Sequence, residues 1–166
     1  MPLLRFRAIR DVVIALHVIA VILAFGLPLA YPMLLPYLRR HHPRAMPGVH
    51  DVQHRLNQRL TGPGTVLIFA FGAYLATKRG YWDEPWVLVP LGILLFIAVV
   101  GGGYVVPVTA RLANLARADV ESAPVGGEIT WGHDYDRHYS RYMAVEVLLG
   151  LLVLTAIFFM TTRPFS

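Results

Sequence analysis

The chain has 166 residues, of which 56% are hydrophobic and only 15% are charged, and its mean hydropathy is +0.54. A soluble domain usually has about 25% charged residues, so this composition excludes an ordinary soluble protein and indicates a lipid-embedded one. The absence of cysteine excludes disulfides, thiolate metal sites and cysteine nucleophiles. The net charge of +5 does not indicate nucleic-acid binding, because the basic residues stand at the ends of apolar segments rather than on one basic face.

Four apolar segments are long enough to cross a membrane as helices. About 30 Å of hydrocarbon requires roughly 20 apolar helical residues, since every backbone group must be bonded within its own segment. The segments are residues 12–38, 60–77, 85–110 and 142–162. We therefore expect an all-α, four-helix transmembrane bundle that forms a single domain over residues 1–166.

The first segment is expected to remain as a span and to bend. Its apolar run is much longer than the roughly 7–15 residues of a signal-peptide core, and no small-residue cleavage site follows it. Pro28, Pro32 and Pro36 recur every four residues, and each removes a backbone donor. The spacing predicts a kink in the second half of this span.

His17 is the one histidine inside the first segment. An ionisable side chain in a span normally faces the bundle interior and has a partner or a function. Ala20, Val21 and Ala24 follow it on the same helical face, and such small side chains suit a packed interior or a flat ligand. Because imidazole ligates haem iron and copper and also relays protons, we favour a functional His17 over a histidine that only hydrogen-bonds a neighbouring helix.

A short amphipathic helix is expected between the first two spans, on the membrane surface. Val49, Val52, Leu56 and Leu60 form its apolar stripe, and His50 and His54 lie one turn apart in the same stretch. Such a pair can ligate copper or zinc. The spacing matches no specific metal motif, and solvated loops often contain histidine, so the interpretation without metal is favoured two to one.

The third segment contains three consecutive glycines, Gly101, Gly102 and Gly103. We favour the interpretation that these small residues let a neighbouring helix approach closely. The alternative is a path for a substrate or an ion.

Glu146 is a carboxylic acid about one turn into the fourth segment. A carboxylate at that position must keep a proton or find a cation, so Glu146 is a candidate proton or ion site. Arg55, Arg59 and Arg111 are the candidate partners for a purely structural ion pair. His17 and Glu146 each lie roughly 8–9 Å deep from opposite sides, so two separate sites are expected.

The distribution of basic residues gives an orientation. With four spans, the two termini and the 78–84 loop lie on one side, and the segments 39–59 and 111–141 lie on the other. The first side carries six basic residues: Arg5, Arg7, Arg10, Lys78, Arg79 and Arg163. The second carries nine: Arg39, Arg40, Arg44, Arg55, Arg59, Arg111, Arg117, Arg137 and Arg141. The positive-inside rule therefore favours the 39–59 and 111–141 side in the cytoplasm.

Three stretches resemble a known group of proteins. The run Val12-Val13-Ile14-Ala15-Leu16-His17-Val18-Ile19-Ala20 is similar to the first span of small bacterial four-helix membrane proteins, in which a histidine precedes small residues. The ending Phe159-Met160-Thr161-Thr162-Arg163-Pro164 resembles the Met-x-x-Lys-Pro finish of an uncharacterised family in this group, and Val108-Thr109-Ala110-Arg111-Leu112 also suits its pattern.

Better-known members of this broad group are the membrane domain of copper-resistance protein D and the HemJ-type protoporphyrinogen oxidases. The resemblance implies a four-helix bundle in the bacterial inner membrane, with His17 as a haem or copper ligand. A second ligand would come from a loop, a methionine or another subunit, because no other histidine lies within a span.

The leading hypothesis is a haem- or copper-binding membrane protein with a redox or cofactor-handling role. One alternative is a small transporter or channel that uses the interrupted spans and Glu146. Another is an accessory structural subunit, alone, as a homodimer or within a larger membrane complex. No P-loop, dinucleotide fingerprint or nucleophile–base arrangement indicates a particular enzymatic reaction.

Overall fold

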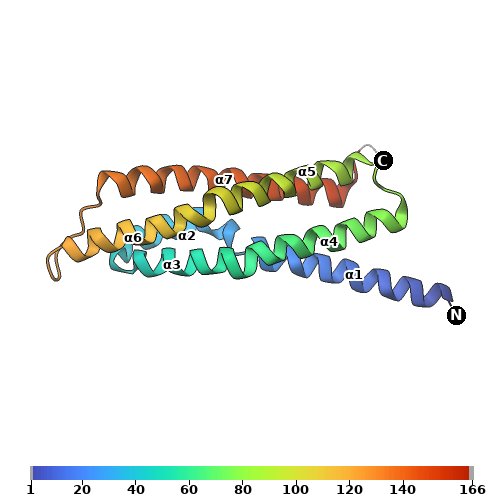
Figure 1. The fold of residues 1–166 in the computed structure, drawn as a ribbon, viewed down its shortest axis with the longest axis horizontal. Coiled ribbons are helices and arrows are strands. Elements are labelled where there is room, and N and C mark those ends of the chain that lie inside the picture. The colour runs from blue at the N-terminus through green and yellow to red at the C-terminus, as the bar shows by residue number, and fades with distance from the viewer. Residues whose placement is uncertain (1, 165–166) are drawn as a thin grey trace.

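The computed structural model describes residues 2–164, and side chains from residue 9 onward. The described chain is helical and contains no strand. In chain order the helices are α1 (Pro2–Phe25), η1 (Pro28–Ala30), α2 (Tyr31–His41), η2 (Pro43–Ala45), α3 (Met46–Leu56), η3 (Asn57–Thr61), α4 (Gly62–Arg79), α5 (Pro85–Val100), η4 (Gly101–Val105), α6 (Val106–Ser122) and α7 (His133–Thr162). Figure 1 shows these helices side by side in one elongated bundle.

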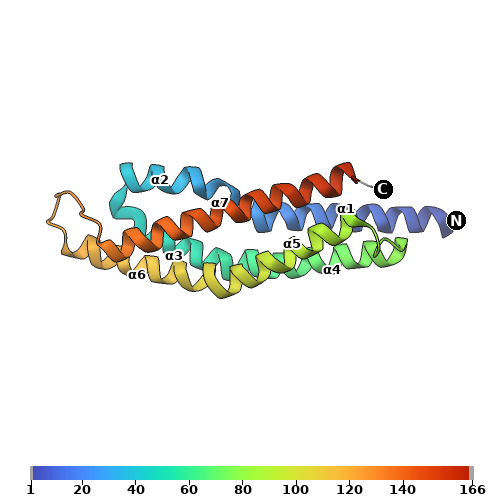
Figure 2. The same ribbon diagram turned by 90° about the horizontal axis from the view of Figure 1, so that it is seen from above.

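Three of the helical rods are much longer than a bilayer is thick. Residues Pro43–Arg79, Pro85–Ser122 and His133–Thr162 form rods of 37, 38 and 30 residues. At 1.5 Å per residue these rods measure about 56, 57 and 45 Å, whereas the hydrocarbon core is only about 30 Å thick. Each rod therefore has one part that crosses the membrane and one part that extends beyond it, and Figure 2 shows the rods running along the whole bundle.

The fourth rod is broken, as the proline spacing predicts. α1 and α2 meet at an angle of 41°, and together they are long and apolar enough to form one bent span. The break occurs at Gly26 and Leu27, and the short η1 begins at Pro28. The all-α membrane bundle expected from the sequence is confirmed: three helices are long and apolar enough to cross a membrane, and the bent α1–α2 pair makes a fourth if it is taken as one span.

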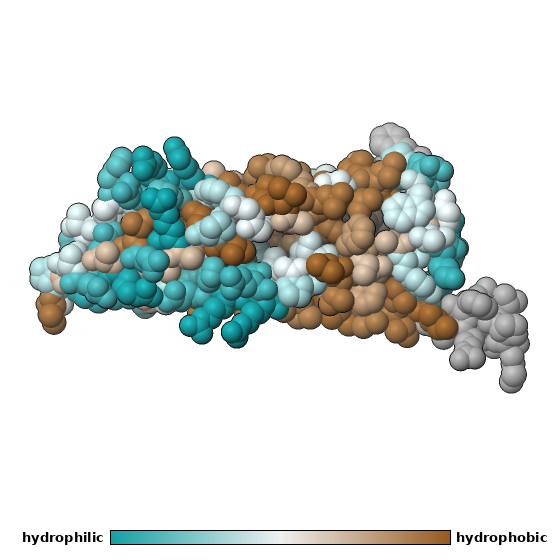
Figure 3. All heavy atoms as spheres, viewed as in Figure 1, coloured by the Kyte–Doolittle hydropathy of each residue, from teal (hydrophilic) through white to brown (hydrophobic). Residues whose placement is uncertain are grey.

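The side-chain distribution divides the bundle into an apolar half and a polar half. In Figure 3, hydrophobic side chains form a broad band in the half of the bundle that holds α1, α4 and α5, with hydrophilic side chains at its tip, and hydrophilic side chains cover most of the other half. In the apolar half, Val66 and Val99 project freely from the surface, as lipid-facing residues do. The polar half contains α2, α3, most of α6 and the first turns of α7.

Two expectations about the polar half are wrong. The segments 39–59 and 111–141, which we expected to be loops apart from the short amphipathic helix, are mostly helical, and in the second only residues 123–132 form a connection without helix. In addition, α3 does not lie apart as a surface helix, because it continues into α4 as one rod. The physical reason is that α3 buries Met46, His50 and Gln53 against α6 and α7, which a helix lying on lipid cannot do.

Small residues bring α1 and α4 into close contact. A Cβ atom at Gly64 would lie 2.8 Å from the Cβ of Ala24. Thr61 Oγ1 donates a hydrogen bond of 3.2 Å to the Ala24 carbonyl across the same contact. Ala20 and Ala24 are both buried, which confirms the packed face predicted after His17.

The three glycines of the third segment serve a different purpose from the one predicted. A Cβ atom at Gly101, Gly102 or Gly103 would meet nothing within 4 Å, so no helix approaches closely there. Instead they belong to η4, a π-helical turn inside the α5–α6 rod. Their effect is on the backbone of their own helix, and Gly101 and Gly102 line a cavity.

Candidate functional sites in two membrane cavities

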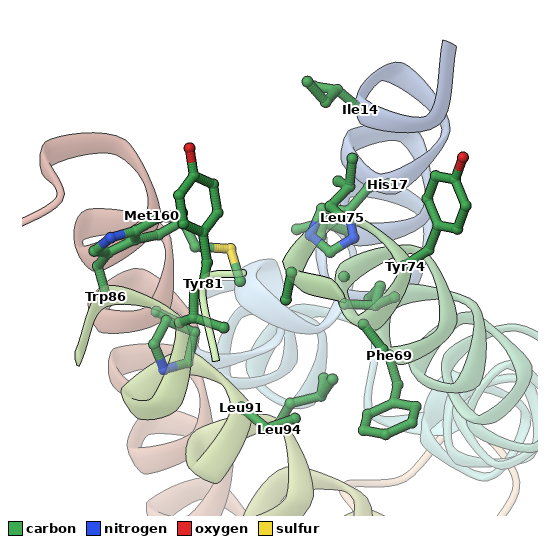
Figure 4. A pocket seen from close by; sticks show the side chains of 18 of the residues that line it. Ile14, His17, Phe69, Tyr74, Leu75, Tyr81, Trp86, Leu91, Leu94 and Met160 are labelled. Atoms are coloured by element: carbon green, nitrogen blue, oxygen red, sulfur yellow. The ribbon is translucent and has the colours of Figure 1, made fainter. Parts of the chain in front are cut away.

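His17 lies on α1 and lines a large cavity in the apolar half. The side chain is 9% exposed, and its Nδ1 atom is buried with no hydrogen-bond partner. Gly72 on α4 leaves room for the ring, since a Cβ at Gly72 would lie 3.4 Å from His17 Cε1. Figure 4 shows the imidazole facing a gap, with Tyr81, Trp86 and Met160 on the other side.

This His17 cavity has a volume of about 960 Å³, which is at the upper end of the range for small-molecule and cofactor sites. Its walls come from α1, α4, α5 and α7, and they are mostly aliphatic and aromatic. Basic side chains also line it: Arg10 within α1, Lys78 and Arg79 at the end of α4, and Arg163 after α7. The cavity therefore combines an apolar interior with cations in its wall.

Glu146 lies on α7 and lines a second, smaller cavity of about 270 Å³. The residue is 5% exposed, and within the described residues no ion pair includes it. The expected structural pair with Arg55, Arg59 or Arg111 is therefore not formed. Tyr142, one turn earlier on α7, is the side chain that interacts with the carboxyl group.

The two cavities are neighbours rather than one site. Phe25, Ile97 and Val153 contribute to the walls of both. His17 borders the larger cavity and Glu146 the smaller, so the structure keeps the two side chains in separate cavities.

A chain of buried polar side chains runs from the polar half toward Glu146. The His50 ring is fully buried, with Nδ1 2.8 Å from Gln53 Oε1 and Nε2 3.1 Å from the Tyr135 hydroxyl. Gln53 Nε2 donates to the Tyr142 hydroxyl at 3.0 Å. The amide oxygen of Gln53 can only accept, so His50 carries its proton on Nδ1 and accepts from Tyr135 through Nε2.

Sequence reasoning missed most of this chain. Tyr135, Tyr139, Tyr142 and Glu146 recur every three or four residues on α7, which places them on one helical face. Tyr135 and Tyr139 lie before the apolar segment 142–162, in a part of the chain predicted as a loop. The helical spacing of the four residues was therefore not recognised. Gln53 follows His50 by three residues, so these two polar side chains also share one face of a helix.

Arg39 fixes the position of α2 against these tyrosines. Its guanidinium lies 4.7 Å from the ring centre of Tyr139, 5.4 Å from that of Tyr135 and 5.5 Å from that of Trp131. It also forms an ion pair with Asp136 on α7. Contacts between a guanidinium and aromatic faces are favourable, and here they hold a bent helix against the long rod.

The predicted metal ligands His50 and His54 lie in other arrangements. Both ring nitrogens of His50 have partners, and His54 Nδ1 lies 2.9 Å from the Val106 carbonyl oxygen. Across the part of the chain that the structure describes, no three histidine or carboxylate side chains form a metal-binding group. Metal binding by this pair remains a prediction without a supporting arrangement.

Comparison with known proteins places the chain in a family. No curated protein and no solved structure matches it significantly. The predicted grouping with copper-resistance protein D and the HemJ-type oxidases therefore stays a prediction. A family model described as a predicted integral membrane protein (DUF2269) matches residues 11–164, nearly the whole chain, so the protein belongs to this family of integral membrane proteins.

Proposed function

We propose that the protein binds haem, or a closely similar planar and anionic tetrapyrrole, in the His17 cavity. The observation that carries this proposal is the buried Nδ1 atom of His17, which has no partner and belongs to a residue in the wall of a large apolar cavity. A buried polar atom without a partner is costly, and a bond to a ligand removes that cost. Imidazole is a common axial ligand of haem iron.

The residues suit a tetrapyrrole better than a bare copper or zinc ion. A bare ion takes most of its three or four ligands from the protein, and the described residues offer no such group. A porphyrin supplies four nitrogens itself and needs only one or two axial ligands. His17 would be one, and Met160, which lines the same cavity, is a candidate for the other.

The charges around the cavity favour an anionic ligand. Four basic side chains line it, Arg10, Lys78, Arg79 and Arg163, and they could bind the carboxylate groups of a ligand. Aromatic residues in its wall, including Tyr81 and Trp86, provide flat faces for a planar ring. When bound, haem would supply one-electron redox chemistry, while the chain would orient it and exclude water from its faces.

The test is an absorption spectrum of the detergent-purified protein before and after titration with haemin. We expect a Soret band that saturates at a fixed haem-to-protein ratio. His17→Ala should lose the band, and His17→Met should keep binding with a changed spectrum because the axial ligand is replaced. His133→Ala is the matched control, since His133 is exposed and far from the cavity in the polar half.

Two results would overturn the proposal. One is wild-type protein that stays colourless with haemin in excess, and the other is a His17→Ala spectrum identical to that of the wild type. Size-exclusion profiles of each variant separate loss of the ligand from loss of the fold. Metal analysis that finds copper without a Soret band would support a copper site in place of haem.

A further inference from the structure

Three helices depart from regular geometry around the Glu146 cavity. Phe25, Pro28 and Leu29 line it from the break between α1 and α2. Asn57 and Thr61 line it from the π-helical η3, and Gly101, Gly102 and Val105 line it from the π-helical η4. Irregular backbone inside a membrane is tolerated where it is buried or borders a cavity, and π-turns are frequent at functional sites.

Polar groups without partners are found beside the same carboxyl group. The Tyr31 hydroxyl and Asn57 Nδ2 are buried and make no hydrogen bond. Tyr31 and Asn57 are 3% and 6% exposed, so neither side chain has an outlet to solvent. Asn57 borders the cavity, and Tyr31 interacts electrostatically with Glu146 from α2.

The buried hydrogen bonds that lead to Glu146 all have the same direction. Tyr135 donates to His50, and His50 donates to Gln53. Gln53 then donates to Tyr142, whose own O–H stays available to donate to the Glu146 carboxyl group, with which Tyr142 interacts one turn along α7. Donors aligned head to tail strengthen one another, so the chain stabilises negative charge on Glu146.

The surroundings of Glu146 therefore act in opposite senses. The apolar wall and the depth in the membrane favour the neutral acid, whereas the aligned donors favour the carboxylate. The titratable groups that face Glu146 are the hydroxyls of Tyr142 on its own helix and Tyr31 on α2. From η3 the cavity wall includes the neutral Asn57, and from η4 it includes glycine backbone. Such a balance suits a carboxyl group that changes its protonation state.

We propose that Glu146 is a proton-exchange site inside the membrane, placed where the α1–α2 break, η3 and η4 meet. A hydronium ion that reaches the cavity transfers its proton to the carboxylate, which gives the neutral acid and water, and the reverse step releases the proton. The proposal uses residues separate from His17 and does not depend on haem binding.

The polar groups around Glu146 favour exchange of a proton over binding of a metal cation. A sodium or calcium ion needs several oxygen acceptors around it. The groups without partners near Glu146 are instead N–H and O–H donors, and the described residues form no carboxylate cluster there. A neutral water molecule, the product of proton transfer from hydronium, can accept from these donors and donate to the carboxylate, whereas a metal cation cannot use N–H and O–H donors as ligands.

Infrared spectroscopy of the full-length protein in liposomes tests the proposal directly. We expect a carboxylic-acid C=O band that titrates with pH, shifts in D₂O and disappears in Glu146→Gln. Glu128→Gln is the matched control, because Glu128 is exposed in the connection before α7, and it should keep the band. Tyr142→Phe should move the band to higher frequency, because the C=O group loses its hydrogen-bond donor.

Each other result would overturn the proposal. If the wild-type protein shows no such band at any pH, it contains no carboxylic acid that exchanges protons. If the band does not change with pH or in D₂O, it comes from a buried carboxyl group that does not exchange its proton. A band that survives in Glu146→Gln belongs to another residue. If Glu146→Gln fails to fold, the Tyr142→Phe variant still tests the proposal. An unchanged band frequency in Tyr142→Phe would contradict the assignment of the band to Glu146.

Discussion

At the scale of single residues, burial alone does not distinguish a ligand from a structural side chain. His17 and His50 are both buried histidines, at 9% and 0% exposure. The difference lies in their partners, since both nitrogens of His50 are hydrogen-bonded and Nδ1 of His17 is not. The sequence predicted a role for His17 from its place in a span, but it gave no means to separate His50 from a surface metal ligand.

Gln53 is the residue whose replacement should cost most in the polar chain. Gln53→Leu removes an acceptor from His50 and a donor from Tyr142, both of which are buried. Each buried group left without a partner costs about 1–3 kcal/mol, so the unfolding transition should move to clearly lower temperature. Thermal unfolding in detergent, followed by circular dichroism, measures the change.

The same substitution at Gln58 provides the control. Gln58 is the other glutamine of the chain and is exposed on η3, so Gln58→Leu leaves no buried group unpaired. We expect its transition to stay close to that of the wild type. Equal losses for the two variants would show that the buried chain contributes nothing specific to stability.

At the scale of elements, hydropathy located the helices but not their ends. Apolar segments identify what faces lipid, so the four spans and the proline bend were predictable. The polar continuation of three rods was not, because helices that pack on one another outside the membrane need no apolar run. The π-turns η3 and η4 also escaped prediction, since Asn57 and Gly101–Gly103 suit several backbone geometries.

The contact between α1 and α4 gives a prediction about these elements. Gly64→Ala places a Cβ 2.8 Å from that of Ala24, so the two helices must move apart. Overpacking of this kind typically costs about 1–3 kcal/mol. The midpoint of denaturant-induced unfolding in mixed micelles should fall accordingly.

Gly92→Ala is the comparison, because nothing lies within 4 Å of a Cβ at Gly92 and the residue is in the middle of α5. An alanine in a helix interior is favoured over glycine by about 0.5–1 kcal/mol, so this variant should be unchanged or slightly more stable. If Gly64→Ala were equally harmless, the close approach of α1 and α4 would not limit the packing.

At the scale of the whole molecule, the bundle has one apolar half, which suits the bilayer, and one polar half. The sequence predicted the apolar half. Of the polar half it predicted only the excess of arginine. It missed that these arginines lie on helices that continue the spans, as Arg39 does on α2. Both cavities lie in or beside the apolar half. The polar half does not cover them, and it is linked to them only through α2, α3 and α7.

The orientation of the two halves can be tested by labelling, because the chain has no cysteine to interfere. Nine basic residues against six favour the polar half in the cytoplasm. Val125→Cys, fully exposed in the 123–132 connection, should then react with an impermeant maleimide only in inside-out vesicles. Asp83→Cys, exposed in the loop between α4 and α5, should react only in intact cells.

Val99→Cys completes this labelling series. Val99 is 73% exposed on α5, yet it belongs to the apolar half, so lipid should shield it from the reagent on both sides. Detergent solubilisation should restore its reactivity. Labelling of Val99→Cys in sealed vesicles would contradict the placement of the apolar half in the bilayer, whereas exchanged patterns for positions 83 and 125 would leave that placement intact and reverse only the orientation.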